Sequence, residues 1–196
     1  MNNGHRTPRV LAISGSLRTA SSNSALVQAL TTLAAEMAHV SVYVGLSELP
    51  PFNPDHDGDD TPLPVQDFRA ALQSCDALVI SSPEYAHGVP GVLKNALDWI
   101  VGSGELIDKP VALINGSPHA THAHASLKET LTVMSDRVVP QASITVSLTG
   151  GKRDAGGIIA DGELSAALQS AMAALTLAAR GILSPSPLIP SFSARA

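Results

Sequence analysis

Five short runs of β-branched and apolar residues, separated by longer segments rich in Ala and Leu, restrict the possible folds of this chain most strongly. They cover residues 10–13, 40–44, 77–80, 111–114 and 143–146. The intervening segments place apolar residues at helical spacing, which predicts helices over residues 23–33, 65–74, 93–100, 122–135 and 161–180. Buried strands that alternate with helices form a parallel sheet covered on both faces. The sequence therefore predicts a doubly wound α/β fold with five buried strands joined by right-handed crossovers.

Two polar motifs directly follow predicted strands. G-S-L-R-T-A-S-S-N-S (residues 15–24) follows the first strand, and S-P-E-Y-A-H-G-V-P-G (residues 82–91) follows the third. In an open α/β sheet, ligands bind outside the carboxyl ends of the strands, near the point where the strand order reverses. We therefore expect both motifs to lie at one ligand site, together with the loop after the fourth strand.

The motif after the first strand has the composition of an anion-binding loop. A helix that begins near Asn23 presents unsatisfied backbone amides and the positive end of its dipole. Arg18 adds a planar cation suited to a phosphate. Hydroxyl groups for the same phosphate come from Ser16, Ser21, Ser22 and Ser24. The alternative is that these residues only cap the helix.

Two other nucleotide-binding patterns are absent from the chain. No G-x-G-x-x-G follows the first strand, and no G-x-x-x-x-G-K-[ST] occurs anywhere. These patterns place the phosphates in dinucleotide-binding dehydrogenases and in P-loop proteins. The sequence therefore disfavours a dinucleotide-binding dehydrogenase.

The motif after the third strand suits a flat ring. Only 3% of the residues are aromatic, so Tyr85 in a predicted loop carries more information than it would in a Tyr-rich protein. Glu84 adds a carboxylate, and Gly88 lets the main chain approach a ligand closely. A phosphate loop and a ring loop at one edge of a sheet together suggest bound flavin mononucleotide (FMN).

Composition limits the remaining possibilities. The chain has 196 residues, a formal net charge of −5 and a single cysteine, Cys75. A modest acidic charge without a basic cluster argues against nucleic acid and anionic membranes as partners. The chain has no apolar run long enough for a transmembrane helix, and one cysteine excludes an internal disulfide, so we expect a cytoplasmic protein. We expect one domain over residues 1–182, an exposed excursion at 50–64, and a Pro/Ser-rich arm at 183–196.

Two groups of potential metal ligands are present, but neither has the composition of a metal site. The histidines are His119, His122 and His124. They have no cysteine or carboxylate beside them, which favours a ligand-facing or solvated loop over zinc. The aspartates are Asp55, Asp57, Asp59 and Asp60. Their glycine is misplaced for a calcium loop, and a glutamine stands where a bidentate glutamate is needed, which favours a solvated acidic loop. We therefore expect no metal site, and no role for Cys75 beyond burial.

The two motifs also give the chain a resemblance to a known family. G-S-L-R with S-x-N, followed by S-P-E-Y-x-x-G-x-P-G-V-L-K-N-A-L-D-W, resembles the NADPH-dependent FMN reductases, which are flavodoxin-like NAD(P)H:flavin and quinone reductases. The similarity includes L-P-x-F-N-P-D at residues 49–55 and spans roughly the first 115 residues. It implies a flavodoxin-like, three-layer fold with five parallel strands in the order 2-1-3-4-5.

The resemblance also implies ligands and site residues. FMN would be the prosthetic group, NADPH or NADH the co-substrate, and a small molecule the electron acceptor; homodimers or homotetramers are common in the family. By position, the phosphate contacts fall to Ser16, Arg18, Ser21, Ser22, Asn23 and Ser24. The ring contacts fall to Pro83, Glu84, Tyr85, Ala86, His87, Gly88, Asn115, Gly116 and Ser117. Ala86 stands where many relatives have asparagine, so a side-chain hydrogen bond to the ring is lost there.

We therefore expect an FMN-containing oxidoreductase that carries hydride from NADPH or NADH to flavins, quinones or similar acceptors in a ping-pong cycle. The cofactor supplies the chemistry, so no side chain is expected to be catalytic. His87 is a candidate for a positional contact. The alternative is an FMN-binding electron carrier that does not itself oxidise nicotinamide, although the modest charge favours the enzyme. A third possibility is a cofactor-free interaction protein on the same fold.

Overall fold

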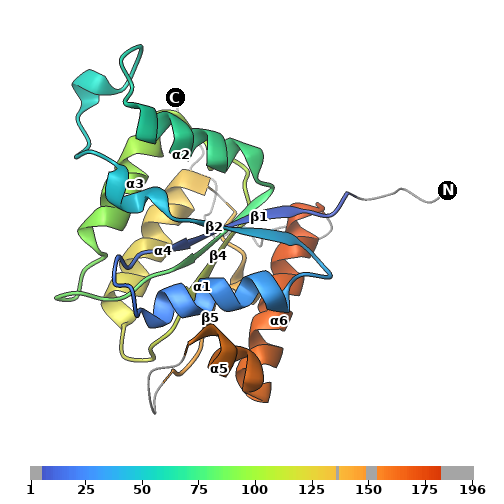
Figure 1. The fold of residues 1–196 in the computed structure, drawn as a ribbon. Coiled ribbons are helices and arrows are strands. Elements are labelled where there is room, and N and C mark those ends of the chain that lie inside the picture. Colours follow the sequence, from blue (N-terminus) through green and yellow to red (C-terminus); the bar gives the residue numbers. More distant parts are fainter. Residues whose placement is uncertain (1–5, 136, 149–153, 182–196) are drawn as a thin grey trace, which may run out of the picture.

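Five parallel strands form one sheet in the computed structural model, which describes residues 6–135, 137–148 and 154–181 (Figure 1). The strands are β1 Arg9–Ser14, β2 His39–Tyr43, β3 Ala77–Ser81, β4 Val111–Asn115 and β5 Ile144–Thr145. Their order is β2-β1-β3-β4-β5, which is that of flavodoxin-like doubly wound sheets. The predicted fold class is therefore confirmed.

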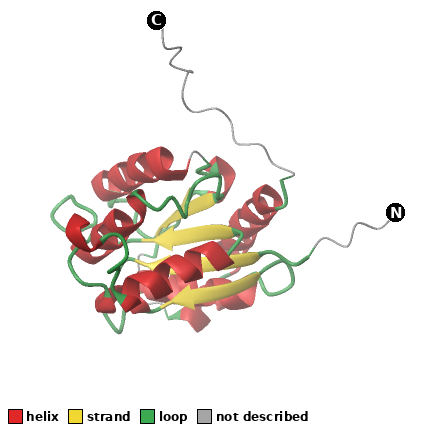
Figure 2. Ribbon diagram, turned by 90° about the horizontal axis from the view of Figure 1, so that it is seen from above, coloured by secondary structure: helices red, strands yellow, loops and turns green. Residues whose placement is uncertain are grey.

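Helices cover both faces of this sheet and give the protein three layers (Figure 2). They are α1 Ser22–Leu33, α2 Leu63–Ser74, α3 Gly91–Val101, α4 Thr121–Ser135, α5 Ala155–Ala160 and α6 Gly162–Ala179. On one face, α1, α5 and α6 pack against Val10 and Ala12 of β1. On the other, α2, α3 and α4 pack against the apolar cluster that includes Leu11 and Ile13. Successive side chains of a strand point to opposite faces, so each central strand contributes to both clusters.

The prediction of five buried strands is correct for the centre of the sheet and wrong for its edges. Every residue of β3 and β4 is buried. In β2, however, His39 and Ser41 are exposed, and β5 has only two residues, of which Thr145 is exposed. An edge strand has a neighbour on one side only, so solvent reaches it.

Helix α5 was not predicted. Its sequence, A-G-G-I-I-A, contains two glycines, which disfavour a helix interior. The helix is stabilised by its N-cap and by burial: Asp154 accepts a hydrogen bond from the Gly157 amide at 2.8 Å, and Ile158 is buried. The arm expected at 183–196 lies outside the described residues.

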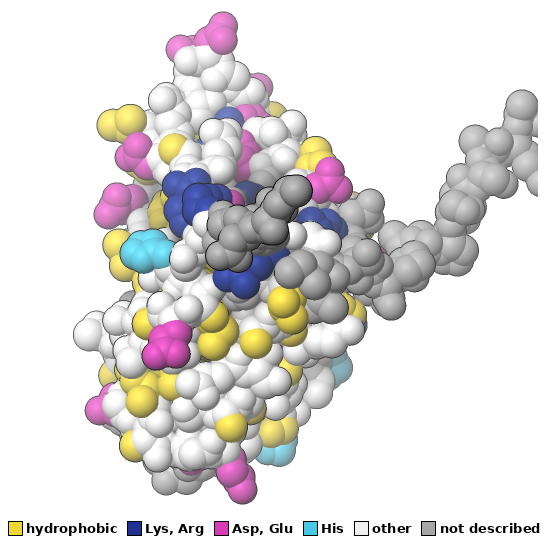
Figure 3. Space-filling model, turned by 90° about the vertical axis from the view of Figure 1, so that its right-hand side faces the viewer, with side chains coloured by type: hydrophobic (Ala, Val, Ile, Leu, Met, Phe, Trp, Pro, Cys, Tyr) yellow, Lys and Arg dark blue, Asp and Glu magenta, His cyan; other side chains and the backbone are white. Residues whose placement is uncertain are grey.

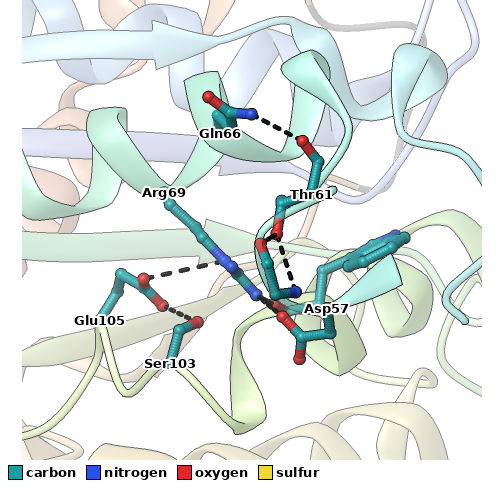
Figure 4. Close-up of polar contacts among 8 residues, drawn as sticks. Asp57, Thr61, Gln66, Arg69, Ser103 and Glu105 are labelled. Atoms are coloured by element: carbon teal, nitrogen blue, oxygen red, sulfur yellow. Dashed lines mark hydrogen bonds and ion pairs between the residues drawn. The ribbon is translucent and has the colours of Figure 1, made fainter. Parts of the chain in front are cut away.

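The Asp-rich excursion after β2 is fastened to α2 rather than freely solvated. Arg69 of α2 donates to Asp57 Oδ1 at 2.6 Å and to the Trp99 carbonyl (Figure 4). The Arg69 Nε lies 3.9 Å from Glu105 Oε1, and Ser103 donates to the same carboxylate at 2.6 Å. The prediction of a solvated acidic loop is therefore wrong at Asp57. The helix α2 also begins at Leu63, inside the predicted excursion.

The start of the same excursion is held by α3. Asn95 Nδ2 and Trp99 Nε1 donate to the Pro50 carbonyl at 2.9 and 2.8 Å. In return, the Phe52 amide donates to Asn95 Oδ1 at 2.7 Å, and the Phe52 ring packs edge-on against Trp99 with centroids 5.1 Å apart. Asn95 and Trp99 of α3 therefore hold the start of the excursion against the helix.

Basic side chains gather in the middle of the face shown in Figure 3, which carries the amino ends of the strands. On that side of the sheet, Arg6 pairs with Asp76 at 2.6 Å, and Arg137 donates to the Asp108 carbonyl at 2.8 Å. These cations bind oxygen atoms of the chain itself and lie across the sheet from its carboxyl edge. Among the described residues, no helix has the length and hydropathy needed to cross a membrane.

Candidate functional site

The loops that follow β1, β3 and β4 meet at the carboxyl edge of the sheet and border a cavity of about 490 Å³. The predicted site residues that line it are Ser22, Asn23, Pro83, Glu84, Asn115, Gly116 and Ser117. They come from three motifs that lie far apart in the sequence. The parallel sheet brings them together, as expected from its topology.

Gly15 allows the β1 loop to approach the β3 loop. Its amide donates to the Ser81 carbonyl at 2.8 Å. A Cβ atom at Gly15 would lie 2.7 Å from Ser82 Oγ and 3.0 Å from Leu93 Cδ2, closer than ordinary contact. Beside this contact, Ser81 Oγ donates to Asn23 Oδ1 at 2.8 Å. The two loops are therefore joined at the base of the cavity.

The N-terminus of α1 is arranged to receive an anion. Ser21 is the N-cap, and its hydroxyl accepts a hydrogen bond from the Ser24 amide at 3.4 Å. The first amides of a helix have no carbonyl partner within it, and here they belong to Ser22 and Asn23, which line the cavity. The first turn contains no acidic residue, so no side chain of that turn offsets the positive end of the helix dipole.

The ring loop ends in a tight turn with an unusual backbone. Tyr85 and Gly88 exchange two backbone hydrogen bonds, of 3.1 and 2.9 Å. Between them, Ala86 and His87 have φ angles of 50° and 61°, the left-handed pair that a type I′ turn requires. This conformation costs roughly 1–2 kcal/mol for a residue with a Cβ atom. Gly88, which closes the turn, does not have a positive φ.

The Glu84 carboxylate bonds in two directions. Oε2 accepts from the Ala123 amide in the first turn of α4, at 2.9 Å. Oε1 lies 2.9 Å from His87 Nδ1. The amide hydrogen bond first, and then the His87 and His122 rings, hold the pKa of Glu84 below its ordinary value. Both carboxylate oxygens of Glu84 are therefore engaged, and the side chain joins the ring loop to α4.

Asn115 shapes the loop after β4. Its Nδ2 donates to the Ala120 carbonyl and its Oδ1 accepts from the Ser117 amide, both at 3.1 Å. A Cβ atom on the neighbouring Gly116 would lie 3.1 Å from Leu26 Cδ1 and 3.3 Å from Leu148 Cδ1. This side of the cavity is therefore packed from beneath by α1 and by the segment after β5.

Other predicted residues lie at the same edge but outside this lining. Arg18, with Ser16 and Ser24, lines a neighbouring cavity of about 380 Å³ beside the end of β2. Its backbone amide donates to Ser16 Oγ at 3.3 Å. Tyr85 is 51% exposed, and Ala86 and His87 are exposed as well. The phosphate and ring contacts predicted for these residues remain predictions.

Three residues of the cavity lining were not predicted, namely Ser82, Ala120 and Leu148, and a fourth, His119, was expected only in a ligand-facing or solvated loop. Leu148 follows the weakest strand, β5, and reaches the site because its amide donates to the Gly116 carbonyl at 3.4 Å. Ser82 is the first residue of the ring motif and lies next to the end of β3. Within the described residues, no group of His, Cys, Asp and Glu is placed to hold a metal ion.

The residues at this edge fit FMN. The cavity volume lies within the range of small-molecule sites. One end offers helix amides and hydroxyls to a phosphate. The other end is bordered by the β3 and β4 loops, where Gly116 exposes its backbone and Leu148 adds an apolar side chain. The arrangement therefore provides an anion-binding end and a flat, partly apolar end within one cradle.

Comparison with known proteins gives consistent results. The family described as NADPH-dependent FMN reductase matches residues 8–150. An NAD(P)H-dependent FMN reductase of Pseudomonas aeruginosa is 31% identical over 174 residues, covering 86% of this chain and 94% of that protein. A probable NADPH:quinone oxidoreductase of Oryza sativa is 43% identical over 94 residues, 46% of each chain. The structure of FerB, a flavoenzyme NAD(P)H:(acceptor) oxidoreductase from Paracoccus denitrificans, has a TM-score of 0.71 at 27% identity and covers 89% of this chain and 98% of that one.

Proposed function

This chain belongs to the NADPH-dependent FMN reductase family, and from that premise we propose that the cradle formed by the β1, β3 and β4 loops is its FMN site. The protein is an oxidoreductase that uses NADPH or NADH to reduce flavins or quinones. The observation that carries the site assignment is the meeting of all three predicted loops around a single cavity.

The proposed phosphate contacts come from the loop after β1 and from the N-terminus of α1. The residues are Ser16, Arg18, Ser21, Ser22, Asn23 and Ser24. The amides of α1 hold the phosphate by hydrogen bonds, and the exposed Arg18 supplies a cation from the neighbouring cavity. The proposed ring contacts are Pro83, Glu84, Tyr85, Ala86, His87, Gly88, Asn115, Gly116 and Ser117. Of these, Asn115 and Gly116 form the packed side and Tyr85 the exposed side.

Bound FMN supplies the hydride-accepting and electron-donating chemistry, so the protein needs no nucleophile. The chain's own residues bind the cofactor and orient the reacting molecules. Backbone amides of the ring loop stabilise negative charge that develops at the cavity, and the open side beside Tyr85 admits one flat ligand at a time. Donor and acceptor would then occupy the same place in turn, so we expect ping-pong kinetics.

We propose that residues 1–182 form the reductase domain, that 183–196 form an arm, and that the protein acts in the cytoplasm as a homodimer or homotetramer. The resemblance to a family in which homodimers and homotetramers are common supports this oligomeric state. Light scattering on the purified protein measures the oligomeric state.

The visible absorption spectrum tests the proposed function. Purified protein, or protein incubated with FMN and desalted, should be yellow, and anaerobic addition of NADPH or NADH should bleach the flavin band. Quinone added afterwards should restore the band. A protein that retains no FMN would refute the proposal, whereas a yellow protein that neither nicotinamide bleaches would identify an electron carrier instead.

A further inference from the structure

We infer that Glu84 is a positioning residue of the FMN site: its carboxylate fixes the ring loop (residues 83–88) against the first turn of α4 and so sets the width of the ring cavity. The inference rests on the proposed function, because it assigns a role within that site. It concerns the side chain of Glu84, not the backbone contact to the ring that was predicted from the sequence.

The contacts of Glu84 bridge two parts of the chain that are otherwise separate. Its Oε2 accepts from the Ala123 amide at 2.9 Å, across 39 positions of the sequence. The side chain is only 11% exposed, although the residues that follow it, Tyr85 to His87, are exposed. The carboxylate therefore lies beneath the turn, between the ring loop and the helix.

The receiving end of α4 suits a carboxylate. The amides of a first helical turn lack carbonyl partners within the helix, and a negative charge near the positive end of the dipole is stabilised. Glu84 therefore caps α4 from a distant part of the sequence. The lowered pKa of Glu84, caused first by the Ala123 amide, agrees with this contact.

The second oxygen of Glu84 holds the turn itself. Oε1 lies 2.9 Å from Nδ1 of His87, whose φ of 61° is left-handed. The His87 ring also packs edge-on against His122 of α4, with centroids 4.3 Å apart. The titratable groups that face Glu84 are thus His87 and His122. Through His87, the carboxylate holds a turn whose backbone is not intrinsically favoured.

Two substitutions separate this role from a general effect on stability. Glu84→Ala removes both contacts. Glu84→Gln keeps the acceptor for Ala123, and its amide group can donate to Nδ1 of a neutral His87 but not to a protonated one, because an imidazolium has only donors. The glutamine variant should therefore hold the turn while His87 is neutral and release it when acid protonates the ring.

The experiment measures the FMN dissociation constant by flavin fluorescence, and kcat and KM for NADPH, at pH 8 and pH 6. Glu84→Ala should weaken FMN binding about tenfold and lower kcat by about tenfold to a hundredfold, with a smaller change in KM, because the ring shifts relative to the donor. At pH 8 Glu84→Gln should lie closer to the wild-type protein than to the alanine variant, because it keeps both contacts but not the charge, and at pH 6 it should approach the alanine variant. Glu129→Gln, at an exposed position of the same helix, is the control and should change neither quantity.

The outcomes distinguish the two proposals. A wild-type protein that binds no FMN would refute the proposed function. Normal FMN binding by the wild type, with Glu84→Ala indistinguishable from Glu129→Gln, would overturn the positioning role alone. If Glu84→Ala does not fold, Glu84→Gln provides the test. The change in its FMN dissociation constant between pH 8 and pH 6 is compared with that of the wild-type protein, and equal changes would overturn the positioning role.

Discussion

Replacing Gly15 by alanine is expected to weaken FMN binding by at least about tenfold, which corresponds to about 1.4 kcal/mol. The new Cβ atom would lie 2.7 Å from Ser82 Oγ and 3.1 Å from Ser82 Cβ. Rotation of the Ser82 hydroxyl relieves only the first contact, so the β1 loop has to move away from the β3 loop. This movement weakens the hydrogen bond from Ser81 Oγ to Asn23 Oδ1, which is 2.8 Å long. Because this crowding occurs in packed surroundings, the free energy of unfolding should also fall by about 1–3 kcal/mol.

Gly162→Ala is the matched control for this experiment. Gly162 is the first residue of α6, and a Cβ atom there would meet nothing within 4 Å. The substitution should leave FMN binding unchanged and stabilise the protein by about 0.4–1 kcal/mol, because alanine restricts the unfolded chain. Fluorescence titration with FMN and urea unfolding measure the two quantities. Equal FMN affinities for the Gly15 and Gly162 variants would contradict the assigned contact between the loops.

Replacing Arg69 by methionine should lower the free energy of unfolding by about 3–5 kcal/mol, because it leaves a buried carboxylate without its cation. The carboxylate is that of Glu105, whose side chain is 2% exposed, and Arg69 Nε lies 3.9 Å from its Oε1. The same change releases Asp57 and the Trp99 carbonyl, both of which accept hydrogen bonds from Arg69 (Figure 4). Urea unfolding followed by circular dichroism measures the loss.

A double-mutant cycle separates the charge from the packing at Arg69. Glu105→Gln removes the buried negative charge that loses its cation in Arg69→Met. It keeps an acceptor for Ser103, which donates to Glu105 Oε2 at 2.6 Å. In the Arg69→Met background this second change should therefore restore stability, whereas in the wild-type protein it should reduce it. Strictly additive losses from the two changes would show that the two residues are not coupled.

The centre of the fold could be predicted because its signals are local. The strands β3 and β4 begin where the apolar runs begin and end one residue later, and both are buried on two faces. The edge strand β2 breaks this pattern, since Ser41 is exposed and pairs on one side only. The short helix α5 was missed because its two glycines oppose the helical pattern, and the Asp154 cap and burial of Ile158 stabilise it instead.

The site could be predicted as a meeting of loops but not as a set of contacts. Its position follows from the topology of a parallel sheet, whereas the bonds that shape it join distant residues, as Glu84 does with Ala123. The turn after Tyr85 also has no local signal, because its left-handed residues are Ala86 and His87 and not a glycine. Tertiary contacts impose that conformation, which propensity alone disfavours.

Hydrogen exchange of the backbone amides, measured with and without FMN, tests the central claim most directly. If one cradle holds both the phosphate and the ring, FMN should slow exchange together in residues 15–23, 82–88 and 115–117. These are the three segments that each contribute part of the cavity lining. The amino ends of the strands should be unaffected. Bound FMN that slows exchange in only one of these loops, or elsewhere in the protein, would contradict the claim.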